Sequence, residues 1–466
     1  MENLNDIYTN QIKTYIKINI SLLKNNRILL LNVKSQLKNI LEMIGQMNLK
    51  IVALGEEDDI YNFPYYWKIK YIKGSLDDVR FPHSLFDSIF IFVDSKTSLS
   101  YINSNELSRI LKPNSNIHLV FTDENSLLKR DAYIGILSKD FDLLEDDKFI
   151  INLKNKKKLN KRNIDVIYVY HPNILGDGVT EYAKHLIYRL GKKGFKVVEG
   201  LPPVEDENNI VLVEYEELLA ARNKMKSLRE LPKNSFVEIH SKTLQGLRKD
   251  LIYLYHGIPS YYNLNFKEIN WYYVPHIAYE IEVPKIKKKY DFCSFGFWFR
   301  YKRFDQIRKL KGKKKLVLSF NHLTLEDEFV KDMCKKILRH PLNMICDSPL
   351  ASSKNLKFLI KLKYNLLRLY NVKVIIKDYI PFSDLVKELS ECKSFIFFQE
   401  TDAPSSGSMR LAAAFGVPVY AKDNLRSRDS QAIRFNNLEE IYRLPKDSIS
   451  IDDGLDYILA LIEYKN

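Results

Sequence analysis

Short apolar runs alternate with amphipathic stretches along most of the chain. The runs RILLLNV, KIVALG and FDSIFIFV have the continuous apolar character of buried strands, and LKNILEMIGQM among them has the apolar period of a helix. Comparable series begin at IDVIYVY (164–170) and FCSFGF (292–297). Strand–helix–strand alternation is typical of parallel sheets covered by helices. The pattern therefore predicts an α/β fold made of three Rossmann-like units.

Lysine-rich stretches interrupt this pattern twice. KNKKKLNK (154–161) and KIKKK (285–289) have the composition of solvated linkers, and we place the domain joints there. The predicted domains are residues 1–155, 156–284 and 285–466.

Composition places the chain among globular proteins. Its 466 residues are 45% hydrophobic and 28% charged, which excludes disordered and collagen-like classes. No apolar run reaches the roughly 18 residues that cross a bilayer, and the N-terminus is unlike a secretion signal.

The four cysteines are widely spaced and form no C-x-x-C. This favours reduced thiols and a cytoplasmic location over a disulfide framework or a zinc module.

The net charge of +14 raises affinity for polyanions such as phosphorylated substrates, anionic lipids or nucleic acid. Ordinary surface lysine is the alternative explanation. The lysine clusters lack regularly interleaved aromatic residues and match no nucleic-acid motif, so no nucleic-acid partner is expected. Peripheral contact with a membrane that carries lipid-linked glycans is an expectation from this charge.

The first unit carries motifs of a nucleotide-binding fold. An acidic turn at 77–78, Phe-Asp at 86–87 and the Leu-Lys-Pro turn at 111–115 resemble the later half of class I S-adenosylmethionine-dependent methyltransferases. The glycine-rich turn of that family is replaced here by Asn-Val-Lys-Ser-Gln at 32–36, and Glu56 alone stands at the place of the acidic ribose ligand. Only glycine allows the backbone to approach the cofactor closely. S-adenosylmethionine is therefore not expected to bind, and the unit is predicted to be a scaffold.

The second unit opens with a glycine-containing turn. Gly176 and Gly178 follow a strand and precede a helix whose free amides can face an anion, although an ordinary turn has the same pattern. The segment resembles the opening of GT-B glycosyltransferases, particularly family 4 retaining enzymes, including the helix end Leu-x-x-x-Gly at 190–194. The resemblance implies that Gly176 and Gly178 lie at the donor phosphates.

Histidines follow several strands. His256 comes directly after LIYLY, at the sheet edge where ligands of open α/β folds bind. We predict that it is a catalytic side chain that hydrogen-bonds the sugar or the reacting centre; a histidine satisfied by local backbone is the alternative. His240 and His276 are weaker candidates for the same role. The other histidines have no metal-ligand spacing, and no metal site is predicted.

The third unit carries a glycine and a lysine six residues apart. Gly296 and Lys302 resemble the segment that opens the nucleotide-binding half of the same family, and Arg300 substitutes for an arginine that the family has at position 297. The resemblance implies that Lys302 and Arg300 are catalytic, because they neutralise the diphosphate and stabilise the departing nucleotide. Gly296 would bind the donor. A solvated basic turn is the alternative.

The stretch from 372 to 424 also resembles this family, with a small-residue loop at a helix start. Such a loop exposes amides to an anion. The predicted donor-binding residues here are Glu400, Ser405, Ser406, Gly407, Ser408 and Arg410. The two glutamates that the family usually carries are replaced by Ala403 and Leu411.

These resemblances imply a GT-B glycosyltransferase with a cleft between its last two units. It would move a sugar from a nucleotide-sugar donor to an unidentified glycan, lipid-linked or protein acceptor, with retention of configuration. No cofactor or metal is expected, because basic side chains and helix dipoles replace the metal in this fold. The alternative function, motivated by the two missing glutamates, is a catalytically silent scaffold with a nucleotide-sugar fold.

Overall fold

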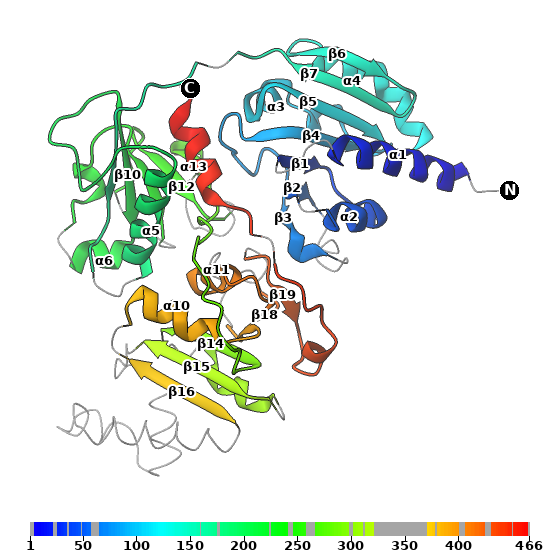
Figure 1. Cartoon of the computed structure of the whole chain (residues 1–466). Coiled ribbons are helices and arrows are strands. Elements are labelled where there is room, and N and C mark those ends of the chain that lie inside the picture. Colours follow the sequence, from blue (N-terminus) through cyan, green and yellow to red (C-terminus); the bar gives the residue numbers. More distant parts are fainter. Residues whose placement is uncertain are drawn as a thin grey trace, which may run out of the picture. The chain divides into compact units, whose positions relative to one another are not determined.

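The chain folds into three predominantly parallel β-sheets with associated helices (Figure 1). The computed structural model describes residues 4–21, 26–34, 37–47, 49–56, 65–158, 160–174, 178–222, 225–240, 246–257, 266–297, 302–310, 313–320, 371–377, 380–399, 406–424, 430–449 and 451–464. The predicted α/β fold of three Rossmann-like units is confirmed.

The chain divides into two compact bodies of unequal size. The larger body contains Met1–Ala278 and Ser450–Asn466, and the smaller body contains Tyr279–Ile449. The first and second sheets belong to the larger body and the third sheet to the smaller body. The predicted cleft lies between sheets of different bodies and stays a prediction.

The first sheet has the strand order β3-β2-β1-β4-β5-β7-β6. β7 is antiparallel to β5 and β6, and the other neighbours are parallel. Its strands are β1 (Arg27–Leu31), β2 (Lys50–Gly55), β3 (Ile69–Lys73), β4 (Phe86–Val93), β5 (Leu111–Phe121), β6 (Phe141–Asp146) and β7 (Ile150–Asn155). Its helices are α1 (Leu4–Ser21), α2 (Lys38–Gly45), α3 (Ser104–Ile110) and α4 (Arg130–Leu137).

Alternation along β1 and β4 distributes the apolar side chains over both faces of this sheet. Ile28 and Phe90 belong to the core beneath α1 and α2, whereas Leu29 and Ile91 belong to the core that contains residues of α3 and α4. Burial on both faces explains why these strands are continuously apolar.

The second sheet has the strand order β13-β12-β11-β10-β8-β9, and all its neighbours are parallel. Its strands are β8 (Val166–Tyr170), β9 (Val197–Glu199), β10 (Asn209–Tyr215), β11 (Phe236–Ile239), β12 (Ile252–Tyr255) and β13 (Asn270–Tyr273). Its helices are α5 (Gly178–Lys192) and α6 (Glu217–Arg222). β10 and β13 are not among the predicted strands.

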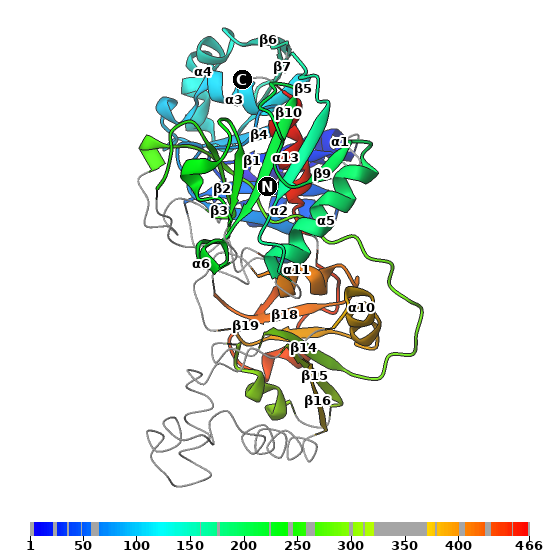
Figure 2. The ribbon, with the colours of Figure 1, turned by 90° about the vertical axis from the view of Figure 1, so that its left-hand side faces the viewer.

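The third sheet has the strand order β16-β15-β14-β17-β18-β19, again all parallel (Figure 2). Its strands are β14 (Phe292–Phe297), β15 (Lys315–Phe320), β16 (Val372–Lys377), β17 (Phe395–Phe397), β18 (Val419–Lys422) and β19 (Ile433–Phe435). Its helices are α10 (Phe382–Ser390) and α11 (Gly407–Ala413).

Two cysteines of the smaller body are paired. Cys293 in β14 and Cys392 after α10 form a disulfide across 99 residues of sequence. The expectation of reduced thiols is therefore wrong for this pair. Sequence spacing could not reveal it, because the two residues meet only through the pairing of distant segments.

The C-terminal helix α13 (Gly454–Glu463) packs in the larger body (Figure 1). Arg27 of β1 makes buried ion pairs with Asp452 and Asp456, and its guanidinium lies 4.7 Å from the ring centroid of Tyr457. Tyr457 also packs against Tyr273 of the second sheet. Residues 450–466 therefore join the larger body, which differs from the predicted third domain at 285–466.

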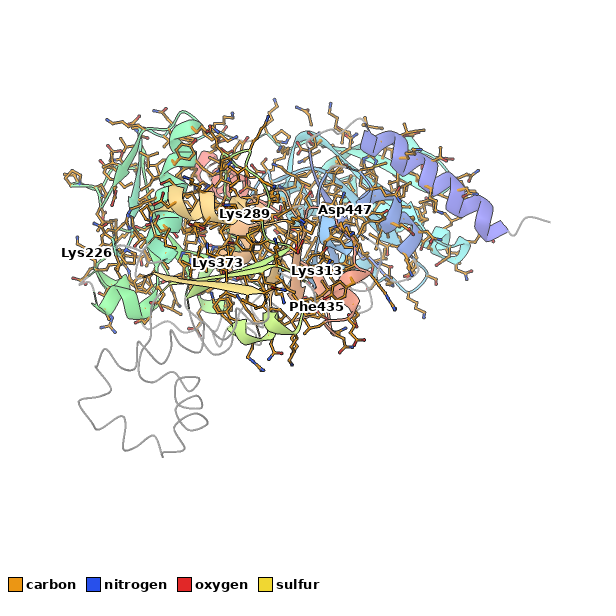
Figure 3. The ribbon with its side chains drawn as sticks, turned by 60° about the horizontal axis from the view of Figure 1, so that its bottom comes forward. Lys226, Lys289, Lys313, Lys373, Phe435 and Asp447 are labelled. Atoms are coloured by element: carbon orange, nitrogen blue, oxygen red, sulfur yellow. A yellow bond between two sulfur atoms is a disulfide. The ribbon has the colours of Figure 1, made fainter. Side chains whose placement is uncertain are left out.

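Lysines of the smaller body lie at the beginnings of three strands. Lys289 comes before β14 and Lys313 before β15, while Lys373 is the second residue of β16 (Figure 3). These parallel strands place all three lysines at the amino edge of the third sheet, and Lys289 forms an ion pair with Glu391.

None of the described helices is both long enough and apolar enough to cross a membrane.

Candidate functional site

The third sheet has the strand arrangement of a nucleotide-binding fold. Counted from β14, its order is 3-2-1-4-5-6, in which ligands bind beyond the carboxyl ends of the strands where the order reverses. The reversal falls between β14 and β17. Gly296 is the second-last residue of β14, and α11 follows β17 in the chain. Gly296 and the start of α11 thus lie at this edge.

Gly296, Lys302 and Ser408 lie together at that edge. Gly296 has a φ of +124°, and a methyl group on its α-carbon would overlap Lys302 Nζ and lie 3.4 Å from Ser408 Oγ. The side chain of Lys302 is buried. The structure therefore places an ammonium and a hydroxyl beside a strand end that has no side chain of its own. A 3₁₀ helix, Phe304–Lys309, follows Lys302 where an α-helix was expected.

The helix start after β17 is where the sequence predicted it. Ser406 caps α11, since its Oγ accepts a hydrogen bond of 3.4 Å from the amide of Met409. A methyl group on Gly407 would meet no atom within 4 Å, so space is open there. Arg410 and Leu411 are buried. Leu411 is one of the buried apolar residues of the smaller body.

Four predicted donor-site and catalytic residues lie outside the described residues: Gly176, Arg300, Glu400 and Ser405. Gly178 is described and begins α5, with open space around its α-carbon. The roles assigned to all of these residues stay predictions.

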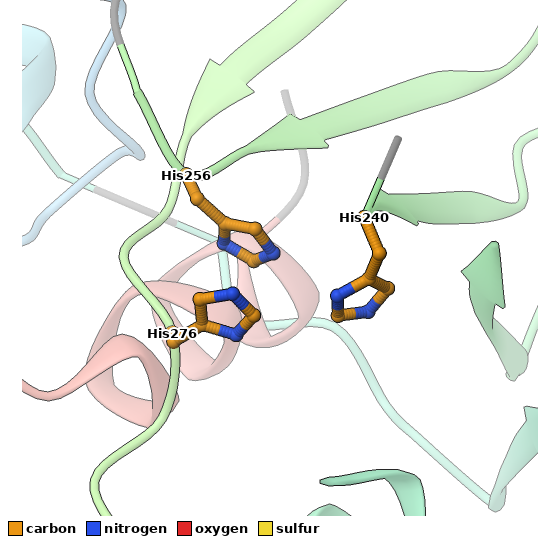
Figure 4. Close-up of side chains that lie close together, drawn as sticks. All are labelled: His240, His256 and His276. Atoms are coloured by element: carbon orange, nitrogen blue, oxygen red, sulfur yellow. The ribbon is translucent and has the colours of Figure 1, made fainter. Parts of the chain in front are cut away.

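His256 lies inside a buried cluster at the carboxyl edge of the second sheet. Its Nδ1 is 3.0 Å from the carbonyl oxygen of Val274, and its ring stacks on His276 with centroids 3.5 Å apart. The ring of His240 lies 5.2 Å from that of His256 (Figure 4). We call His240, His256 and His276 the histidine cluster. The backbone bond agrees with the alternative interpretation of His256, and its catalytic role stays a prediction.

Three residues around the histidine cluster were not predicted. Glu214 in β10 and Glu238 in β11 are Cα partners on adjacent strands, and we call them the carboxyl pair. His240 Nε2 lies 2.8 Å from Glu214 Oε2, and His256 Nε2 lies 3.5 Å from Glu238 Oε1. Tyr182 of α5 donates a hydrogen bond to Glu238 Oε1. The sequence signal for Glu214 was an acidic residue near the end of the otherwise apolar run NIVLVEY (209–215).

Burial dominates the electrostatics of these groups. It raises the pKa of Glu214 to about 8. Burial, together with the nearby Glu214 charge, raises the pKa of Glu238 well above its usual range. Burial likewise raises the pKa of Tyr182. The carboxyl pair is therefore hard to ionise fully without a compensating positive charge.

Side chains occupy the corresponding edge of the first sheet. Asn32, after β1, has a φ of +56° and donates a hydrogen bond of 2.6 Å to the carbonyl oxygen of Phe92. The backbone N–H of Asn32 also donates a hydrogen bond of 3.1 Å to the hydroxyl of Tyr101. Lys34 Nζ forms an ion pair of 2.5 Å with Asp94, which follows β4. These groups lie where β1 and β4 meet and the strand order reverses.

No protein-family model matches the chain, and no curated protein matches it significantly. Among solved structures, an alpha-glucosyltransferase (AGT) in complex with UDP is 12% identical, with 61% of this chain and 89% of that chain covered and a TM-score of 0.34. TarM is 11% identical, with 59% and 52% covered and a TM-score of 0.30. The tRNA (m1A58) methyltransferase TrmI from Aquifex aeolicus is 14% identical, with 31% and 68% covered and a TM-score of 0.24. Likeness at this level carries no argument about activity or ligands.

Proposed function

We propose that the chain is a glycosyltransferase that moves a sugar from a nucleotide-sugar donor to an acceptor. One observation carries the proposal: Lys302 Nζ lies beside Gly296 and Ser408 where the strand order of the third sheet reverses. Open α/β sheets bind nucleotides at such an edge, and an ammonium there can compensate a diphosphate. The resemblance of the surrounding segments to family 4 enzymes supports the same function.

The proposed role of Lys302 is to stabilise the leaving nucleoside diphosphate. Breaking the bond between the sugar and the phosphate oxygen leaves negative charge on the diphosphate, and a fixed cation lowers the energy of that state. Ser408 would donate a hydrogen bond to the same group. Acceptor identity, retention of configuration, membrane contact and cellular location stay predictions.

A panel of nucleotides tests the proposal. UDP, GDP and ADP are each titrated into the full chain by calorimetry. We expect at least one to bind, and the matching nucleotide sugars to be hydrolysed slowly without acceptor. Lys302→Ala should weaken binding and turnover by at least ten-fold. Lys393→Ala, which removes an exposed ion pair with Asp291, is the matched control and should change neither.

The second candidate function is a silent scaffold, favoured by the apolar burial of Leu411 at the place of a family glutamate. No binding and no hydrolysis across the panel would support it and contradict the enzyme.

We further propose that the first sheet binds no S-adenosylmethionine. Asn32, Lys34 and Asp94 occupy the edge where that cofactor would lie. Titration of S-adenosylmethionine into the full chain should give no binding heat, and a measurable affinity would contradict this proposal.

A further inference from the structure

The three imidazoles of the histidine cluster and the carboxyl pair meet in the interior of the larger body. The proposed transfer reaction uses neither carboxyl of that pair. We infer that the histidine cluster, together with Glu238, binds a divalent transition-metal ion of the zinc class. The inference concerns the larger body alone and does not depend on the proposed donor site in the smaller body.

Strand register brings these ligands together. The β11 residue Ile239 is the Cα partner of Tyr255 in β12, which is itself the partner of Tyr273 in β13. His240 and His256 are the next residues after the first two strands, and His276 follows the third strand by three residues. Parallel strands therefore carry all three imidazoles to the same sheet edge. Within each of the sets His240–His256–His276 and Glu214–Glu238–His240, one ligand atom per residue lies within 4.8 Å of the others.

Hydrogen bonds outside the histidine cluster orient two of the rings. A carbonyl oxygen only accepts, so the bond of 3.0 Å to Val274 places a proton on His256 Nδ1 and leaves a lone pair on Nε2. Glu214, when ionised, accepts from His240 Nε2 and leaves the lone pair on Nδ1. Metal-binding histidines usually donate their second ring N–H to a carboxylate or a backbone carbonyl in this way. In Figure 4 the three rings face one another across a common space.

Charge also favours a cation at this place. Glu214 and Glu238 are almost completely buried. Among the described residues, the ion pairs of these two carboxyls are with His240 and His256, and none is with a lysine or an arginine. A buried carboxylate is costly unless a positive charge compensates it. A divalent ion would supply that charge and allow both carboxyls to ionise.

The ligand set selects the class of metal. Imidazole nitrogen with carboxylate oxygen suits zinc and neighbouring transition metals, whereas calcium and magnesium require oxygen ligands. Zinc at about 2.0–2.1 Å from each ligand sets neighbouring ligand atoms roughly 3.3 Å apart. Binding therefore requires the group to contract and the His276 ring to tilt out of its stack on His256. Four protein ligands make a closed site, so the ion would tie together the ends of β11, β12 and β13.

Metal analysis of the full chain, prepared without a polyhistidine tag, tests the inference. The protein is stripped with a chelator and titrated with Zn²⁺ in competition with a chromogenic chelator, and with Co²⁺ by visible absorption. We expect one Zn²⁺ per chain, a higher Tm with Zn²⁺, and the intense absorption of tetrahedral Co²⁺. Absence of stoichiometric binding would overturn the inference.

Three variants locate the site. His276→Gln should weaken Zn²⁺ binding by at least 100-fold and abolish the Co²⁺ spectrum. Glu214→Gln, which alters the outer hydrogen bond of His240 and the contact of Glu214 with Glu238, should weaken binding by about 10–100-fold. His185→Gln is the matched control, because His185 is a buried histidine on α5 that contacts Tyr188.

Wild-type affinity in His276→Gln, or an equal loss in His185→Gln, would overturn the assignment. If His276→Gln does not fold, Glu214→Gln decides, since it keeps the shape of the side chain. Wild-type affinity in that variant would then overturn the inference.

Discussion

The α-carbon of Gly296 lies directly against the side-chain nitrogen of Lys302. Gly296 is the second-last residue of the central strand β14 and has a φ of +124°, a conformation that side-chain-bearing residues rarely adopt. The missing side chain therefore serves two purposes. It allows the backbone to turn after β14, and it leaves room for a buried ammonium where the strand order of the sheet reverses.

Replacement of Gly296 should separate its effect on the backbone turn from its effect on the position of the Lys302 ammonium. Gly296→Ala should displace the Lys302 ammonium and lower nucleotide affinity at least ten-fold, in addition to a backbone cost of roughly 1–3 kcal/mol. Gly200→Ala is the matched control, because Gly200 has a φ of +117° and no atom within 4 Å of an added methyl group. It should lower Tm without changing nucleotide binding, as measured by calorimetry and thermal unfolding. Unchanged nucleotide affinity in Gly296→Ala would remove this contact from the binding site.

A larger side chain at Gly407 should block the donor without unfolding the protein. The space around its α-carbon is open and valine has a higher helix propensity than glycine, so Gly407→Val should not destabilise the fold. We expect nucleotide affinity to fall at least ten-fold in calorimetry. Gly191→Val makes the same change at an open helical position of the larger body and should bind nucleotide normally. Equal affinity in both variants would place the donor elsewhere.

The ion pairs of Arg27 make the stability of the larger body sensitive to acid. Burial alone would raise the pKa of Asp456, but the charges of Arg27 and Lys50 outweigh it and lower the pKa from 3.8 to about 2. A lowered folded-state pKa means that the stabilisation is present above about pH 4 and is lost as the pH falls toward 2. The loss for this one group is at most about 2.5 kcal/mol.

Urea unfolding followed by circular dichroism between pH 2 and pH 7 measures this effect. Asp456→Asn should be less stable than wild type at pH 7, and the difference should shrink as the pH falls through this window. Arg27→Met should cost about 3–5 kcal/mol, because it removes the cation that pairs with the buried carboxylate of Asp452. Arg130→Gln, which removes an ion pair with Asp146 nearer the surface, should cost no more than about 1 kcal/mol. A pH-independent effect of Asp456→Asn would contradict the assignment.

The pairing of Cys293 with Cys392 should stabilise the smaller body. Closing a loop across 99 residues restricts the unfolded chain, and loss of such a bond typically costs about 2–5 kcal/mol. Reductant should therefore lower the Tm of the wild type and leave the double variant Cys293→Ser with Cys392→Ser unaffected. Peptide mapping without reduction should recover the two cysteine peptides linked. Separate, alkylated peptides would show that the pair is reduced in the isolated protein.

Most strands follow from local apolar runs alone. The predicted strands KIVALG (50–55) and FDSIFIFV (86–93) coincide with β2 and β4, and FCSFGF coincides with β14. A strand buried on both faces must be apolar at successive positions, so its own residues reveal it. β10, which was not among the predicted strands, differs from these because it carries a buried glutamate near its end.

The candidate site was predictable to some extent. The spacing of Gly296 and Lys302 pointed to one edge of the third sheet, and the helix start at Ser406 pointed to the same edge. The close approach of Ser408 to Gly296 depends on β14 and β17 being neighbours, which spacing along the chain does not express.

The amino-acid sequence by itself determined the α/β class, the three sheets and the positions of most strands, because these depend on residues that are close together in the chain. Tertiary structure alone decided which distant side chains meet. Arg27 reaches Asp452, Cys293 reaches Cys392, and the histidine cluster meets the carboxyl pair only because parallel pairing brings successive strand ends to one edge. Burial at those meeting points then sets their charge and their chemistry.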